Sequence, residues 1–174
     1  MERYLIVATP AELALVSRDE IRSRHLIITG VGGTNVIQKV KNLPTNSDVL
    51  NVGYAGSSYF PVGSIVHVGS TKLFHPNVKF DEQTFLLGSE SALCLTAGDF
   101  VINGKDLPEK SVVDMELAYI AAFGFKKLKA VKVISDACDL TQYKSKIQDN
   151  NGNKENHSQE NGCEAEDCIR LQES

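Results

Sequence analysis

The sequence predicts an α/β protein with a mixed central sheet that is partly barrel-like and is flanked by helices. Short apolar runs of strand length alternate with segments in which apolar side chains recur at every third or fourth position. A later run alternates apolar and polar residues, which is typical of an antiparallel strand or a barrel wall. The expected strands are residues 4–8, 25–29, 48–52, 64–74, 92–97 and 130–134.

Helices are expected between several of these strands. The first follows Pro10 and carries Glu12 in its first turn, the second follows a glycine-rich turn, and the third ends at Gly124. A second glycine-containing segment, residues 53–58, is expected to be a loop. The expected helical segments are residues 11–22, the later part of 30–43, and 115–123.

Acidic side chains stand at the ends of these elements. Asp136 and Ser135 end the strand 130–134, and open α/β sheets bind ligands at the carboxyl ends of their strands. Glu116 and Glu12 each lie in the first turn of an expected helix, where an acid also interacts favourably with the helix dipole. The residues alone therefore leave two interpretations open, a structural role and a role in a pocket.

Composition limits the function classes. The 174 residues fit one domain, expected over residues 1–148, and the polar composition of residues 149–174 predicts a disordered tail. A net charge of −4 gives no general attraction to nucleic acid or to anionic membranes, so a small neutral or zwitterionic ligand fits better. No segment approaches the ~20 apolar residues of a membrane span, and we expect a cytoplasmic protein.

The four cysteines do not form a disulfide framework. Cys94 and Cys138 lie in apolar runs and are expected to be buried. Cys163 and Cys168 lie in the tail with His157, which gives fewer ligands than a zinc site needs. The sequence predicts neither a metal nor a cofactor.

Five motifs follow one another along the chain, and they are NVGYAGS, VGSIVHV with LFHPNV, AGDFVING, VVDMELAYIA and VISDACD. In this order they resemble the nucleoside phosphorylase and nucleosidase superfamily, most of all the methylthioadenosine/S-adenosylhomocysteine nucleosidases. The resemblance extends from about Tyr4 to Asp139. It implies a nucleoside phosphorylase-like fold and a small-molecule nucleoside as the partner.

The resemblance also implies roles for individual residues. Asp136 would protonate or hydrogen-bond the purine N7, with Ser135 holding it in place. Glu116 would accept hydrogen bonds from the ribose 2′ and 3′ hydroxyls, and Met115 would pack against the sugar. Glu12 would orient and deprotonate the attacking water.

Further residues would shape the pocket around the base and the 5′ substituent. Val101 and Ile102 would line the base pocket, and Val101 stands where the family has an aromatic side chain. Phe100 is adjacent and could take that stacking role. Phe74 would help to form the 5′-substituent pocket, across a dimer interface.

The chemistry of an N-glycosidic bond fits such a site. The bond breaks through an oxocarbenium-like transition state, which needs an acid at the leaving base and a carboxylate near the water and the sugar. Burial that raises the pKa of one acid would separate these roles, and Asp136 and Glu12 are the candidates. Asn51 stands where phosphorylases usually carry a phosphate-binding arginine, so water is the favoured nucleophile. We therefore expect hydrolysis of a purine nucleoside or 5′-thio-nucleoside.

Departures from the family keep two alternatives open, a phosphorylase and a protein that binds a nucleoside without cleaving it. Tyr54 replaces a serine near the water, and Lys132 replaces an arginine. The segment 80–92 is short, which implies a missing or reduced helix. The polar sequence after Leu140 replaces a C-terminal helix, so we expect a partner or another copy to cover the apolar surface, and we expect a homodimer.

Overall fold

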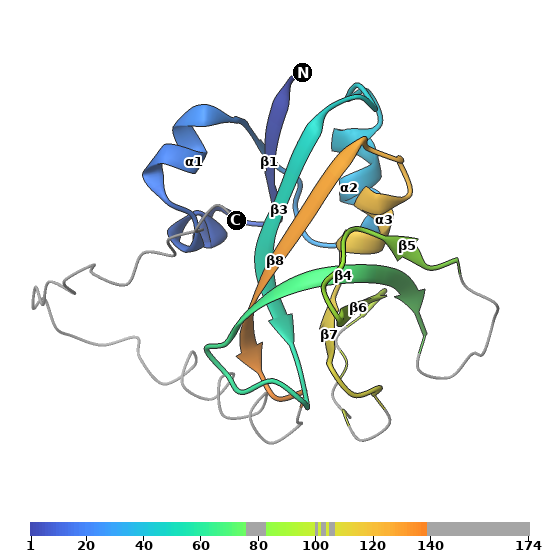
Figure 1. The fold of residues 1–174 in the computed structure, drawn as a ribbon. Helices are drawn as coiled ribbons and strands as arrows, with labels where there is room; N and C mark the ends of the chain where they lie inside the picture. Colours follow the sequence, from blue (N-terminus) through green and yellow to red (C-terminus); the bar gives the residue numbers. More distant parts are fainter. Residues whose placement is uncertain (76–82, 100, 102–103, 105–106, 139–174) are drawn as a thin grey trace, which may run out of the picture.

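The structure is a computed structural model, and it describes residues 1–75, 83–99, 101, 104 and 107–138 (Figure 1). The predicted tail therefore lies outside the described residues. The strands are β1 Arg3–Val7, β2 His25–Ile28, β3 Asp48–Gly56, β4 Ile65–Phe74, β5 Phe85–Leu86, β6 Ala92–Ala97, β7 Ser111–Asp114 and β8 Lys127–Asp136. The helices are the 3-10 helix η1 Pro10–Leu15, and α1 Arg18–Ser23, α2 Gly33–Val40 and α3 Leu117–Ala121.

The eight strands form one mixed sheet in the order β2-β1-β3-β7-β6-β4-β5, and β8 pairs with both β3 and β4. The strands β3, β8, β4, β6 and β7 thus make a five-stranded ring that closes where β7 returns to β3. That closing contact is one residue pair, Gly56 with Val113, so the barrel is partial. The predicted mixed and partly barrel-like sheet is confirmed.

Helices cover both faces of the open part of the sheet (Figure 1), with η1 and α1 on one face and α2 and α3 on the other. Successive side chains of β1 explain this layering, because a strand directs neighbouring residues to opposite faces. Leu5 and Val7 pack toward η1, whereas Ile6 packs against Val36 and Ile120 of α2 and α3. An unbroken apolar run is therefore the pattern of a strand that is covered on both faces.

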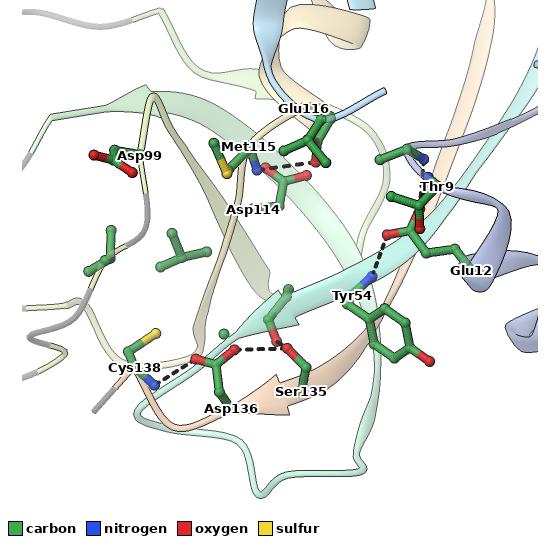
Figure 2. Close-up of a pocket in the computed structure, with 16 residues that line it drawn as sticks. Thr9, Glu12, Tyr54, Asp99, Asp114, Met115, Glu116, Ser135, Asp136 and Cys138 are labelled. Atoms are coloured by element: carbon green, nitrogen blue, oxygen red, sulfur yellow. Dashed lines mark hydrogen bonds between the residues drawn. The ribbon is translucent and has the colours of Figure 1, made fainter. Parts of the chain in front are cut away.

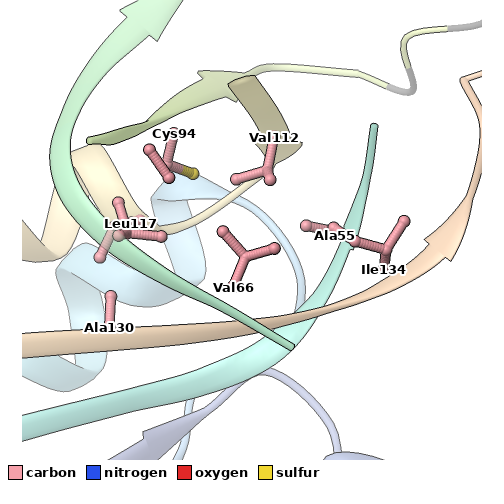
Figure 3. Close-up of a cluster of buried hydrophobic side chains, with 9 residues drawn as sticks. Ala55, Val66, Cys94, Val112, Leu117, Ala130 and Ile134 are labelled. Carbon is pink, nitrogen blue, oxygen red and sulfur yellow. The ribbon is translucent and has the colours of Figure 1, made fainter. Parts of the chain in front are cut away.

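The barrel interior holds a separate apolar cluster (Figure 3). Its buried members are small or β-branched side chains, with Leu117 as the longest, and this suits the narrow interior of a short barrel. The cluster comprises Ala55, Val66, Val68, Ala92, Cys94, Val112, Leu117, Ala130 and Ile134. Cys94 and Cys138 are buried and free, as predicted. In the described part of the chain, no helix is long and apolar enough to cross a membrane.

Two local predictions are wrong, and β5 and β7 have no counterpart among the expected strands. The helix expected over residues 11–22 is two short helices, because Ser17 caps α1 by accepting a hydrogen bond from the N–H of Glu20 at 3.2 Å. The loop expected over 53–58 is largely strand, since β3 continues to Gly56 along β8. β7 was not anticipated, because its short buried run directly precedes α3 and resembles the start of that helix.

Candidate active site

One cavity of about 320 Å³ lies where the strands of the ring end, next to η1 and α3 (Figure 2). The three acids that the sequence singled out, Glu12, Glu116 and Asp136, all line it although they are far apart in the chain. In Figure 2, Glu116 lies above the cavity, Glu12 to its right and Asp136 below it. The lining residues are Ala8, Thr9, Glu12, Val31, Tyr54, Ala55, Gly56, Asp99, Val101, Val113, Asp114, Met115, Glu116, Ser135, Asp136 and Cys138.

Asp136 is held at the end of β8 by its neighbours. Its Oδ2 accepts a hydrogen bond from Ser135 Oγ at 2.8 Å, and its Oδ1 accepts one from the backbone N–H of Cys138 at 3.0 Å. The register of β3 and β8 shifts at this point, so that Asp136 pairs with Gly56. Such an irregularity redirects a side chain at the end of a strand. Ser135 Oγ and the N–H of Cys138 thus hold the Asp136 carboxylate in place.

Glu12 is buried and is fixed by three backbone N–H groups. Its Oε2 accepts hydrogen bonds from Ala8 at 2.6 Å and Thr9 at 3.0 Å, and its Oε1 accepts one from Tyr54 at 3.1 Å. The hydrogen bond from Thr9 belongs to a capping box at the start of η1. In this motif, the side chain of the third helical residue accepts a hydrogen bond from the backbone N–H of the N-cap residue. The bond to Tyr54 ties η1 to β3. Glu12 therefore has a structural role and also borders the cavity.

Glu116 stands at the N-terminus of α3 and points toward the glycine turn before α2. Its Oε1 accepts a hydrogen bond from the N–H of Gly32 at 2.8 Å, and its Oε2 accepts one from Met115 at 3.3 Å. Burial raises the pKa of the Glu116 carboxyl, and the charge of Asp114 raises it further. The charge of Lys132 and the two N–H donors oppose this increase.

The remaining predicted residues divide into three groups. Met115, Ser135 and Val101 line the cavity. Phe74 does not line it, and instead packs at the end of β4 against the buried cluster that contains Leu95. Its expected contribution across a dimer interface stays a prediction. Phe100 and Ile102 lie outside the described residues.

Sequence reasoning missed Asp114 and the partner that neutralises it. Asp114 ends β7 at the cavity wall, and its Oδ2 lies 2.7 Å from Nζ of Lys132, which is itself buried. The available signal was the pair of acids around Met115, of which only Glu116 was assigned a role. Lys132 interrupts the apolar run of β8, but a sequence does not reveal which carboxylate a buried lysine contacts.

Cys138 also lines the cavity, close to Asp136 and Gly56. Burial raises the pKa of its thiol to about 11, with the charge of Asp136 contributing to the increase. The thiol therefore stays protonated at neutral pH and acts as a small apolar wall. Among the described residues, no group of three or more histidine, cysteine, aspartate or glutamate side chains is arranged to hold a metal ion.

Gly56 provides a local test of how strictly Asp136 must be held. A Cβ at this position would lie 2.7 Å from Asp136 Oδ1 and 2.6 Å from Cys138 Sγ, so Gly56→Ala must displace the carboxylate. A misplacement of about 1 Å costs about 100-fold in the rate of a reaction that depends on the group. We expect that loss in turnover of the substrate proposed below. Gly88→Ala, at a glycine with nothing within 4 Å, is the control, and equal rates for both variants would contradict the assignment.

The chain has a nucleoside phosphorylase-like fold, and this is the fold of the solved structures that match it. No protein-family model matches the sequence, and no curated protein matches it. The structural neighbours are MTA/SAH nucleosidases and a futalosine hydrolase of the nucleoside phosphorylase/nucleosidase superfamily. The fold that the five motifs predicted is therefore confirmed.

Three of the solved structures that match this chain show the extent of the similarity. The MTAN of Chlamydia trachomatis has a TM-score of 0.64 and 20% identity, covering 86% of this chain and 89% of that chain. An MTA/SAH nucleosidase from Streptococcus pneumoniae has a TM-score of 0.64 and 18% identity, covering 84% and 89%. Futalosine hydrolase of Helicobacter pylori has a TM-score of 0.64 and 13% identity, covering 85% and 90%. At these identities the likeness establishes the fold, and the chemistry depends on the site.

Proposed function

We propose that this chain is an N-glycosyl hydrolase that cleaves a purine nucleoside or a 5′-thio-nucleoside, of the methylthioadenosine or S-adenosylhomocysteine type, to free base and sugar. One observation carries the proposal. Three carboxylates from η1, the start of α3 and the end of β8 border a single cavity. Hydrolysis of a glycosidic bond needs acids at two positions, and a third suits the sugar hydroxyls.

The contacts of each carboxylate agree with its proposed role. A carboxylate has about four acceptor sites, and the described hydrogen bonds occupy three of them on Glu12, so that about one is left on Oε1 for a water. Glu116 has about two sites left, enough for the 2′ and 3′ hydroxyls. Asp136 lies across the cavity, where it would donate a proton to N7 of the leaving base.

Two features favour water over phosphate as the nucleophile. Asn51 is buried in β3, and both ends of its amide have partners inside the protein. Its Oδ1 accepts a hydrogen bond from Lys132 Nζ at 2.9 Å, and its Nδ2 donates one to the carbonyl of Ile6 at 3.1 Å. The described lining also carries five carboxylates, of which Lys132 neutralises one, and the negative charge of the others would repel a phosphate dianion. The carboxylates are those of Glu12, Asp99, Asp114, Glu116 and Asp136.

The direct test is release of free base from purified protein. Adenosine, inosine, methylthioadenosine and S-adenosylhomocysteine would each be incubated with and without inorganic phosphate. The proposal predicts base release from at least one of them in the absence of phosphate. Release that requires phosphate would establish a phosphorylase, and tight binding without release would establish a nucleoside-binding protein.

We also propose that the chain forms a homodimer. Large apolar side chains are exposed along the segment from β3 to β4, with Tyr59 47%, Val62 55% and Ile65 48% exposed. A second copy would remove such a patch from water. Sedimentation velocity should give the mass of two chains, and Ile65→Lys should shift the protein to a monomer. A monomeric wild-type protein would contradict the proposal.

A further inference from the structure

Each of the five strands of the ring contributes one buried polar side chain to a connected series inside the molecule. These side chains are between 0% and 4% exposed, and they are Asn51 of β3, Lys132 of β8, Asp114 of β7, Thr96 of β6 and Thr71 of β4. None of the motif roles above uses this series as a unit. Buried polar side chains of this kind stabilise one arrangement when every member has a partner.

Lys132 is the cation of the series. Its Nζ lies 2.7 Å from Asp114 Oδ2 and donates to Asn51 Oδ1 at 2.9 Å. Burial alone lowers the pKa of Lys132, but the negative charges of Asp114 and Glu116 oppose this effect, and the net pKa is raised. The lysine therefore remains positively charged inside the molecule.

Asp114 transmits this contact to α3. Its Oδ2 also accepts a hydrogen bond from the N–H of Leu117 at 3.0 Å, and its Oδ1 accepts one from Thr96 Oγ1 at 2.7 Å. Thr96 Oγ1 in turn accepts one from the N–H of Ala118 at 2.9 Å. The first two N–H groups of α3 thus donate hydrogen bonds to side chains of this series, and Glu116 is the residue immediately before them. Because a helix leaves its first N–H groups without internal partners, these contacts fix where α3 begins.

We propose that Lys132, acting through Asp114, is a positioning residue that holds Glu116 at the cavity wall and keeps it in the carboxylate form. The structural part follows from the chain of contacts from Nζ through Asp114 to the first turn of α3. The electrostatic part follows from charge balance. Asp114 repels a negative Glu116, and Lys132 offsets that repulsion. In one respect the inference rests on the proposed function, since it takes Glu116 as the group that binds the sugar hydroxyls.

The groups that face Glu116 define the expected pH dependence. They are the carboxylate of Asp114 and the ammonium of Lys132, with the backbone N–H groups of Gly32 and Met115 as donors. Cys94 faces Lys132 from β6, and burial keeps its thiol protonated by raising its pKa. Replacing Lys132 by a neutral residue removes the charge that lowers the pKa of Glu116, so that pKa rises. As the pH falls, nucleoside binding that needs the Glu116 carboxylate would then be lost at a higher pH than in wild type.

The test compares three variants with wild type. Lys132→Met keeps the length and removes the charge, and Lys132→Arg keeps the charge. Lys132→Met combined with Asp114→Asn removes both charges and keeps an acceptor for Leu117. Lys129→Met, at an exposed lysine of the same strand, is the control for loss of a positive charge. Circular dichroism identifies which variants are folded. If Lys132→Met is unfolded, the double variant is assayed in its place.

With the nucleoside that wild type cleaves fastest, Lys132→Met should raise KM about tenfold with a smaller change in kcat. The acid limb of kcat/KM should move to higher pH. Lys132→Arg and the double variant should recover most of the wild-type KM, and Lys129→Met should equal wild type. A folded Lys132→Met would overturn the inference if its KM and its acid limb changed no more than in Lys129→Met. Where Lys132→Met is unfolded, a folded double variant would overturn the inference if its KM rose about tenfold or more above that of wild type.

A second readout does not depend on turnover. The Glu116 carboxyl carbon can be titrated by NMR in wild type and in Lys132→Met, with Glu116→Gln used to assign its resonance. The inference predicts that the titration midpoint moves to higher pH in Lys132→Met. If wild type releases no base but this midpoint moves, the proposed function fails and the positioning role stands. An unchanged midpoint overturns the positioning role whatever the activity.

Discussion

Asp136→Asn is expected to lower kcat for base release about 1,000-fold, because an asparagine cannot donate the proton that makes the purine a leaving group. The change preserves shape, and the amide can still accept the backbone N–H of Cys138 through its oxygen. The nucleoside should therefore bind almost as tightly as in wild type. Single-turnover measurement of free base, with nucleoside affinity determined separately by calorimetry, checks both parts of this prediction.

The matched control is Asp19→Asn, the same substitution at an exposed acid of α1. It should have the wild-type rate. If Asp136→Asn cleaved the nucleoside as fast as Asp19→Asn, Asp136 would not be the acid, and protonation of the base would have to come from another group that lines the cavity.

Glu12→Gln is expected to lower kcat by about 100- to 10,000-fold, since an amide cannot take the proton of the attacking water. It should also destabilise the fold. Backbone N–H groups donate to both carboxylate oxygens, from Ala8 and Thr9 to Oε2 and from Tyr54 to Oε1. An amide has only one acceptor atom, so at least one N–H must lose its partner, at a cost of about 1–3 kcal/mol.

Urea unfolding monitored by circular dichroism measures the stability of Glu12→Gln, and base release below its unfolding midpoint measures its activity. Glu109→Gln, at an exposed acid before β7, is the control for both measurements. A variant that loses stability but retains the wild-type rate would assign Glu12 a purely structural role, and another group would then have to activate the water.

The sequence was sufficient to predict most strands because each forms a short apolar or alternating run of strand length. β6 has the predicted bounds, Ala92–Ala97, whereas β1 differs from prediction by one residue at each end and β2 by one residue at its C-terminal end. It was insufficient where tertiary pairing decides the structure. Gly53 is strand because its backbone pairs with Lys132 of β8, although glycine on its own disfavours a strand.

The candidate site shows the same division. Glu12, Glu116 and Asp136 could be selected from their places at the ends of elements and from the motifs, and one cavity collects all three. The role of Lys132 could not be selected in this way. Its partner Asp114 lies on β7, and β7 reaches it only because the sheet closes into a ring. Contacts of that kind depend on strand order, which a local pattern does not contain.

The most direct measurement of the central claim follows the oxygen that ends on the sugar. The nucleoside that is cleaved fastest would be incubated with the protein in water enriched in ¹⁸O, first without phosphate and then with it. The mass of the sugar product would be measured by mass spectrometry immediately after a single turnover. The account predicts one ¹⁸O atom on the sugar under both conditions. A sugar 1-phosphate formed only when phosphate is present, or an intact nucleoside after prolonged incubation, would contradict it.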